Sequence, residues 1–126
     1  MITGWDHVHI LCGDVDAAVK FFADHFRGKE ISRQQLRGLP MVRMDVMGLD
    51  IAFLGADPQS PMLLPGKGYR GLDHMGFKVD DLDRTLEELK AKGVTLNAAP
   101  GVTAAGIKYG FINGPEGIRI ELIERK

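Results

Sequence analysis

The chain contains an internal repeat of about half its length, and this repeat constrains the fold more than any other feature. A shift of 67 residues (74 − 7) places Asp6-His7 on Asp73-His74. Each copy has an Asp-His pair in an apolar run, then a short acidic turn, then a helical pattern. Such a repeat predicts two copies of one supersecondary unit, each with a histidine near the start of its first strand. If the copies pack symmetrically, the two histidines converge on one point.

The first copy reads as a βαβββ unit. Residues 5–12 are typical of a buried strand, and Asp14 is a good N-cap for the helix after it. Gly28 is expected to end that helix. The apolar face of the helix comprises Val15, Ala18, Val19, Phe22 and Phe26. The other predicted elements are a strand at 29–36, a turn at 37–40, a strand at 41–47, a hairpin at Gly48 and a strand at 49–54.

The second copy repeats this order. The Gly- and Pro-rich segment before it indicates two modules, 1–56 and 72–126, joined by a connector at 57–71. After a strand at 72–79, Asp80 or Asp81 is expected to cap a helix that Gly93 stops. Its apolar face comprises Leu82, Leu86 and Leu89. The remaining predictions are a strand at 94–97, a loop at 100–106, a strand at 107–112, a turn at 113–117 and a strand at 118–123.

Composition narrows the classes of function. The 126 residues are 44% hydrophobic and 26% charged, as in soluble globular domains. A net charge of −1 gives no electrostatic attraction to nucleic acid or to a membrane surface. The single cysteine, Cys12, excludes an internal disulfide, and Met1-Ile2-Thr3 lacks the pattern of a signal peptide. We therefore expect a cytoplasmic protein.

Three polar residues in predicted strands form a candidate metal site. Glu121 lies in an apolar strand, where an ionised carboxylate is costly unless it is paired or binds a metal. His7, His74 and Glu121 together make a two-histidine, one-carboxylate set, which suits a divalent first-row metal with open positions. His9 shares a strand face with His7, because side chains alternate along a strand.

Each candidate also has a structural interpretation. His7 and His74 could be hydrogen-bonded core histidines, and Glu121 could pair with Arg119 or Arg43 on a sheet surface. Three roles are open for His9: a metal ligand at a position that another residue leaves vacant, a residue that supports a ligand through a hydrogen bond, or a packing residue. For three further residues the structural interpretation is preferred: a solvated strand-start position for Asp50, an exposed helix position for His25 and a buried apolar position for Cys12.

Two segments and the repeat resemble a known family. The doubled βαβββ order, the paired Asp-His strand starts, VDDLDRTLEELKAKGV and GPEGIRIELIE resemble the vicinal oxygen chelate superfamily. That superfamily includes glyoxalase I, extradiol dioxygenases, fosfomycin-resistance transferases and bleomycin-binding proteins. The resemblance implies an α+β fold, in which two βαβββ modules form a cupped mixed β-sheet with helices packed outside. It also implies a homodimer, with modules paired within one chain or across two.

The ligand positions of that superfamily match this chain unevenly. His7, His74 and Glu121 match three of them, and the fourth falls on Ala52, which can neither bind a metal nor move a proton. Glyoxalase-type isomerisation, which uses a carboxylate there, is therefore disfavoured. Extradiol dioxygenases need only the three ligands, but their tyrosine ten residues before the glutamate corresponds to Phe111 here. Tyr109, on the same strand face, replaces it only in part.

Our leading hypothesis is a small enzyme with one divalent metal ion (Fe, Mn, Ni, Co or Zn), which chelates two vicinal oxygens of a small substrate. Lyase, isomerase and dioxygenase chemistry all stay open. The substrate-binding residues predicted beside the metal are His9, Ala52, Tyr109 and Phe111. One alternative is a metal-free protein of the bleomycin-resistance type that binds a drug or metabolite. Another is a degenerate member whose dimer contact is its main role.

Overall fold

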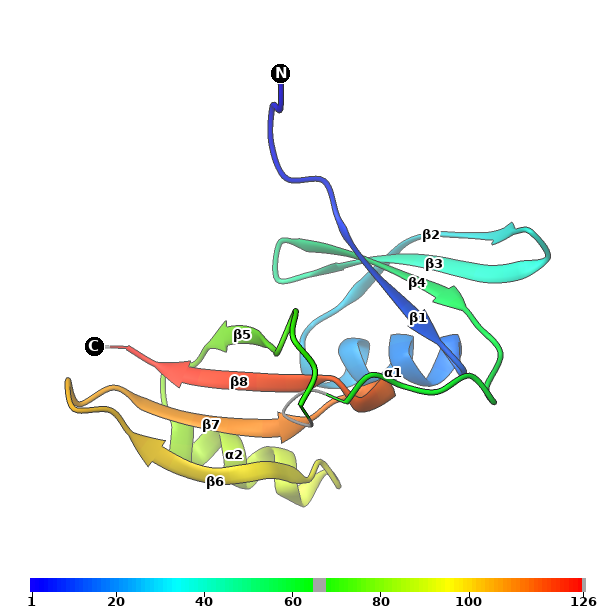
Figure 1. Ribbon diagram of the computed structural model, residues 1–126. Coiled ribbons are helices and arrows are strands. Elements are labelled where there is room, and N and C mark those ends of the chain that lie inside the picture. Colours follow the sequence, from blue (N-terminus) through cyan, green and yellow to red (C-terminus); the bar gives the residue numbers. More distant parts are fainter. Residues whose placement is uncertain (65–67, 126) are drawn as a thin grey trace. The chain divides into compact units, whose positions relative to one another are not determined.

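The computed structural model describes residues 1–64 and 68–125. The chain forms two compact units, Met1–Pro61 (unit 1) and Met62–Lys126 (unit 2) (Figure 1). The boundary between the units lies within the predicted connector 57–71, of which residues 65–67 lie outside the described part of the chain. Over the described residues, neither helix has the length and hydrophobicity that crossing a bilayer requires.

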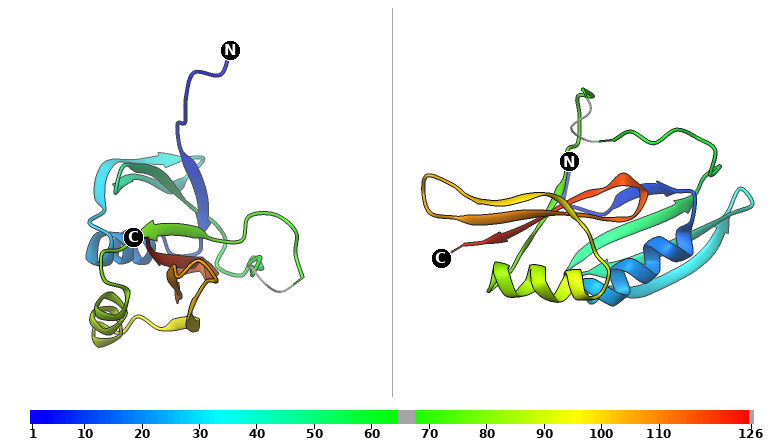
Figure 2. Two further views of the ribbon diagram at one scale, coloured as in Figure 1. Left: turned by 90° about the vertical axis from the view of Figure 1, so that its left-hand side faces the viewer. Right: turned by 90° about the horizontal axis from the view of Figure 1, so that it is seen from below.

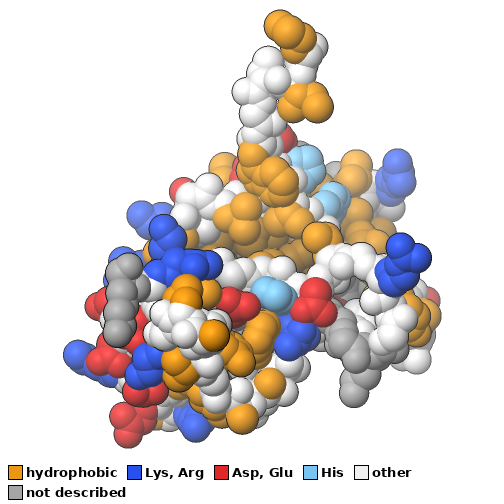
Figure 3. All heavy atoms as spheres, turned by 60° about the vertical axis from the view of Figure 1, so that its left-hand side comes forward, with side chains coloured by type: hydrophobic (Ala, Val, Ile, Leu, Met, Phe, Trp, Pro, Cys, Tyr) orange, Lys and Arg blue, Asp and Glu red, His pale blue; other side chains and the backbone are white. Residues whose placement is uncertain are grey.

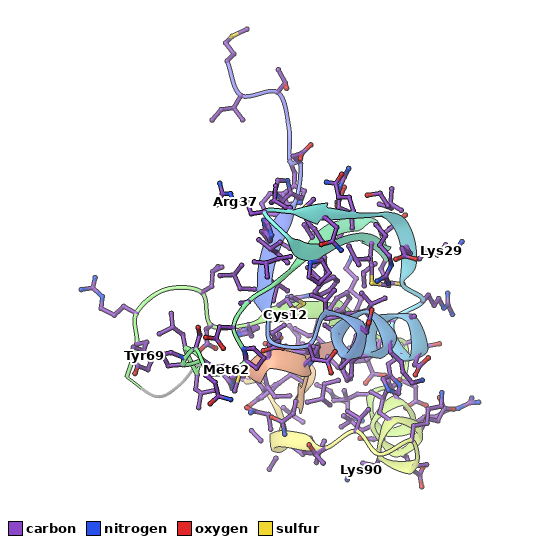
Figure 4. All side chains as sticks on the ribbon, turned by 90° about the vertical axis from the view of Figure 1, so that its right-hand side faces the viewer. Cys12, Lys29, Arg37, Met62, Tyr69 and Lys90 are labelled. Carbon is purple, nitrogen blue, oxygen red and sulfur yellow. The ribbon has the colours of Figure 1, made fainter. Side chains whose placement is uncertain are left out.

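Unit 1 is a four-stranded mixed sheet with one helix. Its elements are β1 (Val8–Cys12), α1 (Val15–His25), β2 (Lys29–Leu36), β3 (Leu39–Val46) and β4 (Leu49–Gly55). The strand order is β1-β4-β3-β2, with β1 parallel to β4 and the other pairs antiparallel. Figure 2 shows α1 along one face of this sheet. In Figure 4, Lys29 is the first residue of β2, and Arg37 directly follows its last residue.

Unit 2 repeats the topology of unit 1. Its elements are β5 (Met75–Lys78), α2 (Leu82–Ala91), β6 (Leu96–Val102), β7 (Lys108–Asn113), a 3-10 turn (Pro115–Gly117) and β8 (Arg119–Glu124). The strand order is β5-β8-β7-β6, and β5 runs parallel to β8. The predicted α+β fold of two βαβββ modules is therefore confirmed.

The two helices begin in the same way, as the repeat predicts. The Asp14 carboxylate accepts a hydrogen bond from the Ala17 amide at 3.0 Å, and Asp81 accepts one from Arg84 at the same distance. Each side chain satisfies an amide that the first helical turn leaves without a backbone partner. Asp81, of the two predicted candidates, is thus the N-cap of α2.

The two helices end differently. Gly93, with φ of +89°, follows α2 in the left-handed conformation that a helix C-terminus commonly adopts, as predicted. After α1 that conformation falls on Arg27, with φ of 54°, and not on Gly28. A Cβ on Gly28 would lie 2.8 Å from the Phe22 carbonyl oxygen, so glycine is needed there for close approach.

The core of each unit lies between its helix and one face of its sheet. In unit 1, Phe22 of α1 packs on Phe53 of β4 with ring centroids 5.6 Å apart, and both side chains are fully buried. Cys12 is buried at the end of β1, as predicted (Figure 4). Because side chains alternate along a strand, the residues between the core positions lie on the opposite side, here called the helix-free face.

Several predicted boundaries are wrong. The strands predicted to begin at residues 5, 72 and 94 begin at Val8, Met75 and Leu96, so His7 and His74 lie directly before β1 and β5. β6 extends to Val102, so the predicted loop at 100–106 begins too early. Two register shifts in the pairing of β6 with β7 accommodate Pro100 and let Gly101 lie beside Tyr109. The predicted turn at 37–40 is also shorter, because β3 already begins at Leu39.

Candidate functional site

His74 and Glu121, two of the three predicted metal ligands, lie together in unit 2. Nε2 of His74 is 3.0 Å from Oε2 of Glu121, and the two side chains are 34% and 19% exposed. Nδ1 of His74 lies 2.8 Å from Oδ2 of Asp73. The imidazole is therefore held between two carboxylates. Figure 3 shows histidine side chains at the molecular surface.

This arrangement favours a positive charge between His74 and Glu121. A neutral imidazole has one N–H group and can donate to only one of the two carboxylates that it faces. If that N–H points to Asp73, a lone pair of His74 meets the carboxylate oxygen of Glu121. A metal cation between the two atoms would remove this repulsion. The pair therefore has the donor chemistry of a cation site.

Asp73 is itself fixed from a neighbouring strand. The hydrogen bond with His74, together with the positive charge of Arg119, lowers the pKa of Asp73 below its ordinary value. Nη1 of Arg119 donates to Asp73, and its Nε donates to Oδ1 of Asn97 at 2.8 Å. Asn97 in turn donates to Asn113 at 2.8 Å. This chain of hydrogen bonds joins β6, β7 and β8 to the residue that orients His74.

Aromatic rings border the His74–Glu121 pair on the helix-free face. The Phe111 ring meets the His74 ring edge-on, with centroids 5.0 Å apart, and the Arg119 guanidinium carbon lies 4.2 Å above Phe111. Tyr109 stands 6.2 Å from Phe111, centroid to centroid. Both predicted substrate-binding aromatics therefore lie on one face with the two ligand candidates.

Unit 1 carries the same Asp-His contact. Nδ1 of His7 lies 2.7 Å from Oδ2 of Asp6, and the His7 side chain is 43% exposed. The hydrogen bond with His7 lowers the pKa of Asp6, and the charge of Arg43 adds to the effect. The carboxylate thus turns Nδ1 of His7 toward itself and leaves Nε2, the atom that at His74 faces Glu121, on the other side of the ring.

The strand registers reveal which residue of unit 1 corresponds to Glu121. In unit 2, Gly76 of β5 is the Cα partner of Glu121 on β8. In unit 1, His9 of β1 is the Cα partner of Ala52 on β4. Gly76 and His9 each follow the repeated histidine by two residues, so Ala52 is the structural counterpart of Glu121.

Two structural interpretations made from the sequence are wrong. Glu121 pairs with His74, and neither Arg119 nor Arg43 is its partner, since Arg119 binds Asp73 and Arg43 binds Asp50. Asp50 is no solvated strand-start residue, because its side chain is only 21% exposed in that ion pair. The register that makes Arg43 and Asp50 neighbours across β3 and β4 is not visible in the sequence.

His25 also differs from the prediction of a simply exposed residue. Its ring lies 5.0 Å from the ring of Phe21, and Nδ1 is buried without a hydrogen-bond partner among the described residues. The helical period predicted the correct side of α1. It could not reveal that Phe21, four residues earlier, covers one edge of the imidazole.

The predicted site residues thus fall into two groups. His74, Glu121, Tyr109 and Phe111 lie in unit 2, and His7, His9 and Ala52 lie in unit 1. Within either unit, the described His, Cys, Asp and Glu side chains form no group of three that could hold a metal. Nothing in the sequence indicated that Arg119 and Asn97 support His74. The only sign of a residue that orients His74 was the aspartate of the repeated Asp-His pair, Asp73.

Several known proteins are similar to this chain. A probable chloroplastic lactoylglutathione lyase of Arabidopsis thaliana is 31% identical over 94% of the chain, and the uncharacterized protein YwkD of Bacillus subtilis is 25% identical over 94%. The chain spans 35% and 43% of the two Arabidopsis lyases that it matches, but 94% of YwkD.

Solved structures share the fold. That of SMU.1112c has a TM-score of 0.81 at 20% identity and covers 98% of this chain and 100% of its own. The fosfomycin resistance protein FosX of Listeria monocytogenes has a TM-score of 0.78 at 19% identity, with 100% and 96% covered. The family profile of the Glyoxalase/Bleomycin resistance protein/Dioxygenase superfamily matches residues 4–122, and the chain therefore belongs to that superfamily.

Proposed function

We propose that this protein is a metal-dependent enzyme in which His7, His74 and Glu121 hold one divalent cation. Two vicinal oxygens of a small substrate would bind at the open positions of that ion. The observation that carries the proposal is the His74 ring, which has a carboxylate at each nitrogen. The first carboxylate orients the ring, and the second faces the nitrogen that would bind the metal.

The residues in unit 2 fit a metal by their spacing. Ligand atoms at about 2.0–2.2 Å from a shared ion are roughly 3 to 3.5 Å apart. The 3.0 Å between Nε2 of His74 and Oε2 of Glu121 lies at the short end of that range, so a small side-chain adjustment admits a cation. A two-histidine, one-carboxylate set suits Fe, Mn, Ni, Co or Zn.

Each residue of the chain would have a distinct task in the reaction. A bound divalent ion would supply Lewis acidity toward the substrate oxygens. Asp73 would keep the Nδ1 proton of His74 and so leave Nε2 as the ligand. Phe111 and Tyr109 would form an aromatic wall beside the substrate. Ala52 would leave space, and no proton acceptor, at the position corresponding to Glu121.

The reaction class follows in part from Ala52. Among the relatives are proteins named lactoylglutathione lyase and fosfomycin resistance proteins, and one FosX structure is described as complexed with Mn(II) and sulfate. An isomerase that needs a second carboxylate is disfavoured by alanine at that position. We therefore propose Mn(II) as the first metal to test and an addition or dioxygenase reaction as the chemistry. A cytoplasmic homodimer is also part of the proposal, and sedimentation equilibrium tests the dimer.

Metal titration tests the proposal directly. Chelator-treated protein would be titrated with Mn(II), and free Mn(II) would be measured by electron paramagnetic resonance. We expect one Mn(II) per chain in the wild type. Both His74→Ala and Glu121→Gln should lower the affinity by more than about 100-fold, above the range for residues that only support a ligand. His25→Gln, a histidine outside the site, is the control.

A result with no stoichiometric Mn(II), and none after reconstitution with Fe, Ni, Co or Zn, would contradict the proposal. So would an affinity that His74→Ala leaves unchanged. Far-UV circular dichroism of each variant would show that the chain is folded when the affinity is measured.

A metal-free binding protein is the second candidate, and Ala52 is the observation that favours it. A small-molecule screen by thermal shift, run with and without chelator, separates the two functions. Stabilisation by a ligand that chelator does not change supports the metal-free protein. Stabilisation that chelator removes supports the enzyme.

A further inference from the structure

Unit 1 presents a second histidine on the helix-free face, beside His7. His9 lies on β1, and His7 lies directly before the first residue of that strand. The ring centroids of His7 and His9 are 6.0 Å apart. His9 is exposed, and no hydrogen bond joins its ring to another described residue. Packing and hydrogen bonding in unit 1 therefore give little reason for an imidazole here.

His9 and its partner on the neighbouring strand correspond to one pair of residues in unit 2, and the large and the small residue of that pair lie on opposite strands in the two units. In unit 2 this pair is Gly76 and Glu121, and a Cβ on Gly76 would lie 3.9 Å from the Cβ of Glu121. In unit 1 it is His9 and Ala52. Each unit thus has one side chain with metal-binding atoms and one small residue in the pair, but on opposite strands.

We infer that His9 supplies the metal ligand that Ala52 cannot provide. The inference rests on the proposed function, because it adds His9 to the ion held by His7, His74 and Glu121. Two imidazoles that bind one ion through nitrogens about 2 Å from it have ring centres roughly 4.5 to 5 Å apart at ordinary ligand angles. The His7 and His9 rings, with centroids 6.0 Å apart, reach that spacing through a shift of about 1 Å, which an exposed side chain such as His9 can make.

The exchange also changes the charge of the ligand set. Three imidazoles and one carboxylate leave a divalent ion with a net charge of +1, whereas a second carboxylate at position 52 would leave none. Two further pairs of charged side chains near these residues are neutralised within each pair, Arg43 with Asp50 and Arg119 with Asp73. A site with three histidines therefore favours an anionic oxygen of the substrate more strongly than a site with two carboxylates.

Counting the imidazoles on bound Mn(II) tests the inference without an activity assay. Electron spin echo envelope modulation detects the nitrogens of metal-bound imidazole. We expect a signal from three imidazoles in the wild type and from two in His9→Gln, with an Mn(II) affinity at least about tenfold lower. The double variant His9→Gly, Ala52→Glu copies the arrangement of unit 2. It should recover the affinity while keeping the two-imidazole signal.

The outcomes separate this inference from the proposed function. If His9→Gln binds Mn(II) as tightly as the wild type and with the same imidazole signal, His9 is not a ligand, and the three-ligand proposal stands. If the wild type binds no divalent ion, both fail. His25→Gln is the matched control and should change neither the signal nor the affinity. Since His9 is exposed, the His9→Gln variant is expected to fold normally.

Discussion

Arg119 illustrates at the scale of one residue how the site is held. Its guanidinium lies over Phe111 and donates to both Asp73 and Asn97, while its side chain is only 20% exposed. A planar guanidinium can stack on an aromatic ring and donate hydrogen bonds to two acceptors at the same time, whereas an ammonium group cannot. Arg119 is therefore a positioning residue, which acts on His74 through Asp73.

Replacing Arg119 should weaken metal binding without removing a ligand. We expect Arg119→Ala to lower the Mn(II) affinity by about 10- to 100-fold, because Asp73 then loses the contact that fixes its carboxylate. Arg119→Lys should recover only part of that loss. Isothermal titration calorimetry measures both. Arg84→Ala, which removes an exposed ion pair with Glu88 on α2, is the control, and an equal loss in that variant would refute the prediction.

The depressed pKa of Asp73 predicts how stability depends on pH. A carboxylate whose pKa is lower in the folded state than the ordinary 3.8 binds fewer protons folded than unfolded. Its contribution to stability is therefore present above pH 3.8 and is lost as the pH falls through the folded-state pKa. In chelator, urea unfolding of the wild type should lose more stability from pH 6 to pH 2.5 than unfolding of Asp73→Asn. Equal losses would show that Asp73 is not responsible.

At the scale of the elements, the sequence predicts most of the local signals but neither the left-handed residue after α1, which is Arg27 and not Gly28, nor the cross-strand contacts. Asp14, Asp81 and Gly93 act within one or two turns of chain, and the sequence predicted their roles. The extent of β6 depends on two register shifts against β7, and the Arg43–Asp50 pair depends on the register of β3 with β4. Registers are set by packing between distant segments, which a single sequence does not display.

The tight contact at Gly28 gives a prediction for the link between α1 and β2. A Cβ there would meet the Phe22 carbonyl oxygen at 2.8 Å, and a backbone atom inside a helix cannot move aside cheaply. Gly28→Ala should lower the free energy of unfolding by about 1–3 kcal/mol. Chemical denaturation measures it. In the control, Gly76→Ala, the nearest contact is 3.9 Å, and unchanged stability is expected there. Similar values for the two variants would contradict the prediction.

At the scale of the whole molecule, the repeat predicted the two modules and the superfamily. It also pointed to the histidine and glutamate that lie together in unit 2. The repeat could not predict that Arg119 and Asn97 hold Asp73 and His74 in place, because neither residue belongs to the motif that the two halves of the chain share. Unit 1 has Asp50 where unit 2 has Arg119, so the two modules share a topology and differ in the side chains around the histidine.

Alanine at position 52 predicts which reaction of the superfamily this protein lacks. Without a carboxylate there, the wild type loaded with Mn(II) or Ni(II) should not isomerise the hemithioacetal of methylglyoxal and glutathione at a measurable rate. General-base catalysis typically contributes 10²–10⁴-fold, so Ala52→Glu should raise the rate by about that factor. Thioester absorbance measures the product. Strong activity in the wild type would contradict this reading of Ala52.

The first and last strands of each unit lie side by side, with β1 against β4 and β5 against β8. During translation, His74 emerges from the ribosome well before Glu121, because β5, α2, β6, β7 and the 3-10 turn are made between them. Because β8 lies between β5 and β7, the nascent sheet lacks its connecting strand until β8 is available, and completing it joins distant parts of the chain. His74 meets Glu121 at that same step, so completion of the sheet also assembles this pair of side chains.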